Sequence, residues 1–94
     1  MKLKSFEPVP HDRKSFYGKC AVYENENGAK ALRSYKTIVM TQDENGELHR
    51  HWAGWSLTTS RHIYAAFLIL TKEYREMPVE PLPAEWGELR DSIR

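Results

Sequence analysis

Apolar and β-branched residues alternate with polar residues in three stretches of the chain, at about residues 17–24, 30–41 and 47–55. This alternation is typical of β-strands that lay one face on a core. Asn-Gly pairs at 27–28 and 45–46 separate the stretches, and both residue types accept the positive φ of tight hairpin turns. The pattern therefore predicts a three-stranded antiparallel meander.

The second stretch carries apolar residues on both of its faces. Leu32, Ile38 and Met40 share one parity, whereas Tyr35 and Val39 have the other. A strand with this pattern either contains a β-bulge or is covered on both faces. The sequence alone leaves both interpretations open.

The period changes after residue 56 and predicts one long helix over residues 60–76. Its main apolar stripe has the spacing i, i+4, i+7, i+11 and consists of Ile63, Phe67, Leu70 and Tyr74. Thr58 or Thr59 can cap the first turn, and Pro78 ends the helix. We expect this stripe to pack across the meander.

Three further apolar residues of this helix, Tyr64, Leu68 and Ile69, lie off the main stripe. A helix that is apolar over most of its circumference is buried on more than one side. The second cover is either the carboxy-terminal segment or another protomer.

The two ends of the chain have a different character from its centre. Residues 1–15 contain two prolines and several charges and predict an irregular arm, and residues 77–83 contain three prolines and predict an extended crossing. Trp86, Leu89 and Ile93 have helical spacing, so a short helix is expected over 84–93, with Trp86 on the outer side of the long helix.

These elements predict a single α+β domain over residues 1–94, in which a β-β-β-α core at 16–76 packs its sheet on one long helix. Residues 77–94 add the proline-rich crossing and an acidic tail with a short helical segment. Ninety-four residues are enough for one core and leave little room for a deep active site.

Cysteine content and hydropathy bear on the compartment. Cys20 is the single cysteine, so no internal disulfide forms, and we expect a reducing, cytoplasmic setting with Cys20 in the core. The amino terminus has no apolar signal region. The longest apolar run covers residues 63–70, far short of the roughly 20 residues that span a bilayer, so no membrane association is expected.

Charge is unevenly distributed although the net charge is only +1. Residues 1–40 hold eight Lys/Arg against four Asp/Glu, whereas residues 76–94 hold two against five. Either the basic half attracts an anionic partner, or the acidic tail folds back beside it and neutralises it.

His49 and His51 form the sharpest local cluster. Side chains two residues apart on a strand share a face, so the two imidazoles could bind a metal ion or act as general acid and base. A metal needs three or four convergent ligands, and no carboxylate lies within two residues of His51. The alternative is an exposed polar face of an edge strand.

A second candidate lies at the start of the predicted helix. Ser56, Thr58, Thr59 and His62 surround free backbone N–H groups there and could form a polar or anion-binding site. The simpler interpretation is that the hydroxyls cap the helix and the imidazole packs inside. No nucleophile elbow is present, and we assign no catalytic residue.

A third candidate is a nucleic-acid surface on the sheet, made of Lys19, Arg33, Tyr35, Lys36 and Arg50. Aromatic and cationic side chains together stack and neutralise single-stranded nucleic acids. Strand parity places about half of the aromatic residues in the core, and the low net charge argues against a strong footprint.

Three runs of the sequence resemble a small family of uncharacterised bacterial and phage proteins. They begin at Ser15-Phe-Tyr-Gly, at Leu32-Arg-Ser-Tyr-Lys-Thr and at Trp52-Ala-Gly-Trp-Ser-Leu-Thr-Thr-Ser-Arg-His62, and the likeness covers about residues 15–70. The family pattern is a Ser-Tyr-x-Thr strand followed by a Ser-x-Thr-Thr-x-x-His helix start. The resemblance implies a compact β-β-β-α domain and a bacterial or mobile-element origin, and it brings no activity or cofactor.

The sequence favours a non-enzymatic binding or interaction protein without a cofactor, which forms a homodimer or binds another protein. The alternative is a nucleic-acid-binding accessory protein that uses the sheet face. A second alternative is a small hydrolase or metal-dependent enzyme that uses His49, His51 and His62.

Overall fold

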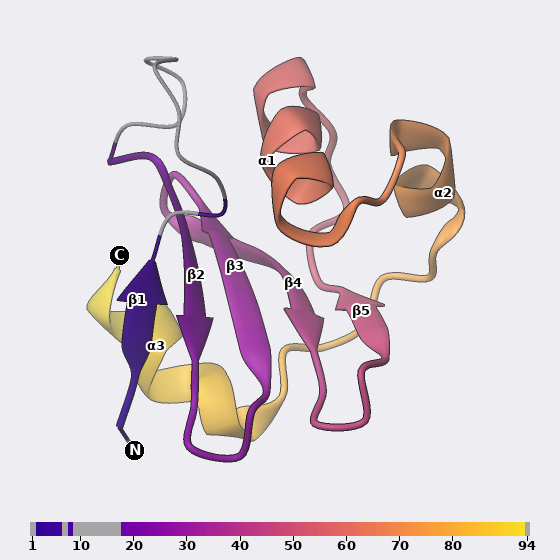
Figure 1. Ribbon diagram of the computed structural model, residues 1–94. Helices are drawn as coiled ribbons and strands as arrows, with labels where there is room; N and C mark the ends of the chain where they lie inside the picture. The colour runs from indigo at the N-terminus through magenta and orange to yellow at the C-terminus, as the bar shows by residue number, and fades with distance from the viewer. Residues whose placement is uncertain (1, 7, 9–17, 94) are drawn as a thin grey trace.

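The computed structural model describes residues 2–6, 8 and 18–93 and contains one five-stranded antiparallel sheet (Figure 1). The strands lie side by side in chain order, so each pairs with its neighbour in the sequence. They are β1 (Lys4–Phe6), β2 (Cys20–Glu24), β3 (Lys30–Ser34), β4 (Thr37–Gln42) and β5 (Leu48–Arg50). The expectation of an α+β fold is confirmed, and the expectation of a three-stranded sheet on one long helix is wrong.

Helices cover both faces of the sheet. On one face lie α1 (Leu57–Phe67) and α2 (Thr71–Glu76), and behind the other lie the 3-10 turn η1 (Ala84–Trp86) and α3 (Gly87–Ser92) (Figure 1). Within the described ranges, no helix is long and apolar enough to cross a membrane.

The stretch expected to form one strand at 30–41 is a hairpin of β3 and β4. Its tight turn contains Tyr35, which has a φ of 56°, a left-handed conformation normally given to glycine or asparagine. Ser34 is the only residue of this turn of a type that favours turns, and the turn lacks Gly, Pro, Asn and Asp, so the sequence pattern did not locate it. The register also shifts between Leu32 and Arg33, which is the irregularity that the mixed parity suggested.

Burial on both faces accounts for the rest of the mixed pattern. Leu32, Val39 and Met40 belong to the cluster beneath α1 and α2, whereas Ala31 and Ile38 belong to the cluster beneath η1 and α3. A strand that is covered on both sides shows no simple alternation.

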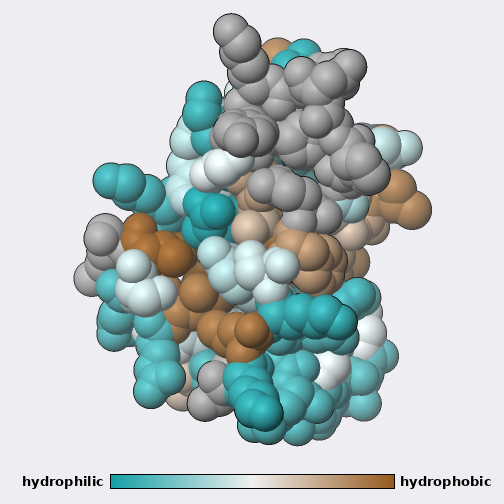
Figure 2. Space-filling model, turned by 60° about the vertical axis from the view of Figure 1, so that its left-hand side comes forward, coloured by the Kyte–Doolittle hydropathy of each residue, from teal (hydrophilic) through white to brown (hydrophobic). Residues whose placement is uncertain are grey.

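β1 lies within the segment that was expected to be an irregular arm. It pairs antiparallel with β2 from Lys4 opposite Glu24 to Phe6 opposite Val22. Phe6 remains exposed at this edge of the sheet. Figure 2 turns this side toward the viewer and shows hydrophobic surface in its middle, with hydrophilic residues around it.

The predicted long helix is broken into two. α1 ends at Phe67 because Leu68 takes a left-handed conformation with a φ of 59°, and the Leu68 N–H donates to the Tyr64 carbonyl at 2.8 Å. Leu70 is extended and begins α2. A hydrogen bond between the hydroxyls of Ser60 and Thr71 joins the two helices.

The start of the helix also differs from the expectation. Ser56 is the N-cap, because its Oγ accepts from the Thr59 N–H at 3.0 Å. A serine three residues before the donating N–H satisfies the cap geometry, so Thr58 and Thr59 lie inside the first turn.

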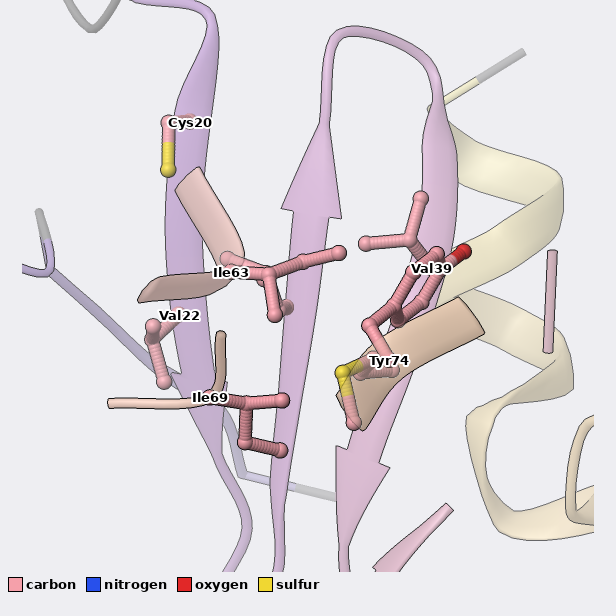
Figure 3. Packing of buried hydrophobic residues seen from close by; sticks show 8 residues of the cluster. Cys20, Val22, Val39, Ile63, Ile69 and Tyr74 are labelled. Carbon is pink, nitrogen blue, oxygen red and sulfur yellow. The ribbon is translucent and has the colours of Figure 1, made fainter. Parts of the chain in front are cut away.

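The larger core cluster lies between the sheet and the first two helices (Figure 3). It consists of Cys20, Val22, Leu32, Val39, Met40, Ile63, Ile69 and Tyr74. Ile63 is buried as expected, and Phe67 packs at the edge of the cluster. Leu70 is 57% exposed, because the break before α2 turns it away from the sheet.

The smaller cluster is closed by the carboxy-terminal segment. Trp86 and Leu89 pack on Ala29, Ala31 and Ile38, and Trp86 is fully buried. The expected position of Trp86 on the outer side of the long helix is therefore wrong. The carboxy-terminal segment folds back against the sheet, whereas neutralisation of the basic half by its acidic residues stays a prediction.

Candidate functional site

The outer face of α1 carries an exposed apolar stripe made of Leu57, Tyr64 and Leu68, with Arg61 between them. Leu57, Arg61 and Tyr64 have the spacing i, i+4, i+7 and lie along one side of the helix, whereas Leu68 is the C-cap just beyond its last residue. Beside the stripe, a groove of about 470 Å³ between α1 and α2 is lined by Leu57, Tyr64 and Leu70 among others. We call this surface the α1 stripe.

Leu68 is the most unusual residue of the α1 stripe. Its side chain is 73% exposed, and its backbone adopts the left-handed conformation in which glycine is normally found after a helix. That conformation costs an L-residue about 1–2 kcal/mol. The chain therefore tolerates strain at this position and gains almost no packing from the leucine, which is the pattern of a residue kept for contact with another molecule.

Charge on this side of the molecule is balanced. Arg61 is the only Lys, Arg, Asp or Glu in α1, and α2 carries Lys72, Glu73, Arg75 and Glu76. The α1 stripe therefore carries one cation among apolar residues and has both signs at its border, a balance that suits a protein partner better than a polyanion.

A buried polar cluster lies on the opposite side of α1, against the sheet. The Ser34 Oγ is 2.8 Å from His62 Nδ1 and 2.9 Å from Thr59 Oγ1. His62 is fully buried, and the Tyr35 ring centroid lies 5.9 Å from that of His62. Because Ser34 has one hydroxyl proton, it donates to at most one of its two partners and accepts from at least one of them.

Two of the four residues predicted for the polar site are thus brought together. Thr59 and His62 meet at Ser34, whereas Ser56 serves as the helix cap and Thr58 takes no part in the described hydrogen bonds. Ser34 was missed as a site residue, although the Ser-Tyr-x-Thr strand contained it. The cluster fastens α1 to β3, and its role as an anion site stays a prediction.

His49 lies between two carboxylates. Its Nε2 is 3.0 Å from Asp43 Oδ2, and its Nδ1 is 3.0 Å from Glu80 Oε2. Hydrogen bonds to Asp43 and then Glu80 raise the pKa of His49, and the hydrogen bond from His49 is the main cause that lowers the pKa of Asp43. His49 therefore links the β4–β5 turn to the carboxy-terminal segment.

His51 is held by other partners. Its Nδ1 donates to the Glu80 carbonyl at 2.9 Å, and its Nε2 is 2.7 Å from Thr41 Oγ1. The four ring nitrogens of the two histidines are thus engaged with protein groups. Asp43, Glu47 and His49 offer donor atoms within 4.8 Å of one another and could hold a divalent cation. Metal binding by His49 and His51 stays a prediction.

The ion pair at His49 predicts a pH-dependent stability. The pKa of His49 is raised in the folded state. Its stabilisation of the fold is therefore complete when the pH is below its usual pKa of 6.5, and it is lost as the pH rises through the folded-state pKa. The pKa of Asp43 is lowered in the folded state, so Asp43 stabilises the fold when the pH is above its usual pKa of 3.8, and this contribution is lost as the pH falls through the folded-state pKa. In urea unfolding, His49→Gln should therefore destabilise the protein most at about pH 5–6 and least at about pH 9.

Lys36→Gln, which removes an exposed charge on the β3–β4 turn, serves as the control. It should show no such pH profile. A constant difference between wild type and His49→Gln over the whole pH range would contradict the assigned ion pair.

Four of the five residues predicted for nucleic-acid binding lie near one another at the β3–β4 turn, because the Tyr35 N–H donates to the Lys19 carbonyl at 2.7 Å, and Lys36 and Arg33 flank Tyr35 there. Arg50 is buried, and Arg33 is tied to the Tyr23 hydroxyl at 3.1 Å and the Tyr35 carbonyl at 2.6 Å. Lys19 and Lys36 are exposed. Since helices cover both faces of the sheet, the stacking platform is not open, and nucleic-acid binding stays a prediction.

Comparison with known families finds a match to a family of unknown function, DUF8033, over residues 1–76. The chain belongs to DUF8033. Comparisons with the curated proteins and with the solved structures found no match. The expectation of an uncharacterised family is confirmed at this level, while its bacterial or phage origin and its two motifs stay predictions.

The DUF8033 match ends at the last residue of α2. It therefore includes the sheet, the buried cluster at His62 and the α1 stripe. The segment that contains η1 and α3, and with it Trp86, lies outside the matched part.

Proposed function

We propose that this DUF8033 protein is a non-enzymatic interaction domain that forms a homodimer through the α1 stripe. The single observation that carries the proposal is Leu68, an exposed leucine in a left-handed conformation where glycine would be more stable. Burial against a partner explains both the apolar side chain and the strain that the free chain tolerates.

The occupant that fits this stripe best is a second copy. In an antiparallel pair of α1 helices related by a twofold axis, Arg61 of each copy lies opposite Tyr64 of the other as a cation–π pair. Leu57 begins the helix and Leu68 caps its end, so these two leucines lie at the two ends of the contact. A stripe that is complementary to itself favours the isologous contact of a twofold dimer, and a net charge of +1 gives two copies little mutual repulsion.

The proposed setting is the cytoplasm of a bacterium or of a phage-infected cell. Cys20 is fully buried in the core, which agrees with a thiol that has a packing role in a reducing compartment.

Leu68→Gly tests this function because its two expected effects have opposite signs. The glycine relieves the left-handed strain, so the monomer should gain about 1 kcal/mol of stability in urea unfolding at low concentration. The same change removes the side chain from the proposed interface and should weaken self-association about tenfold or more in analytical ultracentrifugation.

Leu68→Ala is the matched control, because it removes the side chain and keeps a Cβ in the strained conformation. It should weaken association without the gain in stability. A wild-type chain that stays monomeric at high concentration, or a Leu68→Gly variant that associates as well as the wild type, would exclude the α1 stripe as the interface.

A further inference from the structure

The β4–β5 turn brings together three side chains of the types that bind transition-metal ions. The ligand atoms of Asp43, Glu47 and His49 all lie within 4.8 Å of one another. Two of these residues supply carboxylate oxygens and the third supplies an imidazole nitrogen, which is a donor set that suits Zn²⁺. We call these three residues the turn cluster.

Backbone hydrogen bonds fix the carboxylate of Asp43. Its Oδ1 accepts from the N–H groups of Asn45 and Glu47, both at 2.9 Å. The Gly46 N–H donates to the Asp43 carbonyl at 2.9 Å and closes the turn. Because Oδ1 is occupied in this way, Oδ2 is the oxygen that faces His49.

The separation of two ligand atoms in the turn cluster is close to that found around zinc. His49 Nε2 and Asp43 Oδ2 are 3.0 Å apart. Two donors that bind a tetrahedral ion at about 2.0–2.1 Å are roughly 3.3 Å apart, so a small outward movement admits the ion between them. Glu47 is exposed, so its carboxylate can rotate toward the same point, and a water molecule completes the tetrahedron.

A carboxylate from a distant part of the chain orients the imidazole. Glu80 Oε2 is 3.0 Å from His49 Nδ1, the ring nitrogen that does not face Asp43. When Nδ1 donates to Glu80, Nε2 is the nitrogen that is left to bind a metal, as in the carboxylate–histidine–zinc triads of zinc proteins. Glu80 belongs to the carboxy-terminal segment, so this contact is an observation separate from the proximity of the turn residues.

His51 does not join the turn cluster. Its Nδ1 donates to the Glu80 carbonyl at 2.9 Å, and its Nε2 is 2.7 Å from Thr41 Oγ1. Both of its ring nitrogens are thus engaged with uncharged groups. The ligand set therefore differs from the histidine pair that strand spacing suggested.

We propose that the turn cluster is a zinc site, in which Asp43 and Glu47 each supply a carboxylate oxygen and His49 supplies Nε2. Glu80 is a positioning residue that holds the imidazole through Nδ1. The ion closes the β4–β5 turn and, through His49 and Glu80, fastens it to the carboxy-terminal segment. Because α1 lies toward the opposite end of the sheet, the zinc site does not depend on the proposed homodimer (Figure 1).

Zinc and a proton compete for the same place between His49 and Asp43. In the metal-free chain a proton on Nε2 is shared with Asp43 Oδ2, and the ion replaces it because imidazole binds metals through an unprotonated nitrogen. Two ionised carboxylates then balance the double charge of the ion.

Isothermal titration calorimetry of the chelator-treated, full-length chain with zinc chloride measures the binding. The wild type should bind one Zn²⁺ per chain. Glu47→Gln and His49→Gln should each weaken binding about tenfold or more because each removes a ligand, and Glu80→Ala should weaken it about tenfold because the ring loses its orientation. Glu44→Gln is the matched control, since Glu44 is an exposed carboxylate of the same turn outside the turn cluster, and it should bind zinc as the wild type does.

Nitrogen NMR of the histidine rings supplies a second readout. Zinc should shift the Nε2 signal of His49 and leave both ring signals of His51 in place. In Glu80→Ala the same His49 signal should still shift once zinc is saturating, which is the behaviour of a residue that positions a ligand and is not one itself.

Three results would overturn the zinc site. The first is the absence of zinc binding by the wild type. The second is a loss of affinity in Glu44→Gln as large as that in Glu47→Gln, because this would indicate diffuse attraction by an acidic turn. The third is binding of Ca²⁺ as tight as that of Zn²⁺, because Ca²⁺ takes oxygen ligands and does not use the imidazole.

Two further variants keep the test decisive. Glu47 is exposed, so Glu47→Gln should fold and decides the outcome even if His49→Gln does not fold. Leu68→Gly should bind zinc as the wild type does, so failure of the homodimer and failure of the zinc site are distinguished.

Discussion

Replacement of Arg50 by lysine is expected to lower the free energy of unfolding by about 3 kcal/mol or more, although the charge is kept. The guanidinium is buried and donates over 2.9–3.3 Å to five backbone carbonyls. They belong to Trp52, Ala53, Tyr74, Arg75 and Met77. The guanidinium also lies 4.3 Å from the centre of the Tyr74 ring. An ammonium group has three donors at one point and cannot reach both the carbonyls that follow β5 and those at the end of α2.

Urea unfolding followed by circular dichroism measures this effect. Arg75→Lys is the matched control, because Arg75 is exposed and its guanidinium lies 5.8 Å from the Trp55 ring. The control should change stability by less than about 0.5 kcal/mol. If Arg50→Lys unfolds at the same urea concentration as the wild type, the carbonyl network does not hold the helices to β5.

Trp86→Ala is expected to lower the free energy of unfolding by about 3–5 kcal/mol, which is the usual effect of emptying a site filled by a large aromatic residue. Trp86 has no exposed surface, and the alanines beneath it cannot move in to fill the space. Trp55→Ala makes the same chemical change at a side chain that is 48% exposed, and it should cost about 1 kcal/mol or less.

Thermal unfolding of the two tryptophan variants measures the difference. Hydrogen exchange adds a second readout, because loss of the carboxy-terminal cover should speed exchange in β3 and β4 before the core beneath α1 is affected. Equal midpoints for the two variants would show that Trp86 contributes no more than an exposed tryptophan.

The sequence predicts well those parts of the fold that are determined by residues close together along the chain. The Asn-Gly pairs mark two hairpins, and their glycines, Gly28 and Gly46, do adopt positive φ. The spacing of Ile63 and Tyr74 identifies a helical region that packs on the sheet. Both signals depend on neighbouring residues only, so tertiary contacts do not change them.

The parts that were missed depend on tertiary context. A tight turn at Tyr35 and a helix break at Leu68 both use left-handed backbone at residue types that rarely adopt it. β1 is short and is formed by pairing with β2 rather than by its own pattern. No rule based on local propensity anticipates these three features.

The same distinction applies to the candidate sites. The second apolar side of the helix was identified from Tyr64, Leu68 and Ile69, but it was expected to be covered; Ile69 lies in the core, whereas Tyr64 and Leu68 are exposed and the carboxy-terminal segment packs on the other face of the sheet. The burial of Arg50 could not be predicted, because arginine on a strand is normally exposed, and its acceptors are carbonyls that no side-chain pattern reveals. Asp43 and Glu80 reach His49 from the turn and from the carboxy-terminal segment, too far along the chain for a spacing rule.

The order of the strands has a consequence for folding kinetics. Because every strand pairs with its neighbour along the chain, most of the pairing requires the closure of short loops. Chains of this kind reach their transition state quickly, and folding of the sheet with α1 and α2 should be complete well within about a second. The segment with η1 and α3 follows the strands along the chain, so during synthesis it docks on strands that have already left the ribosome.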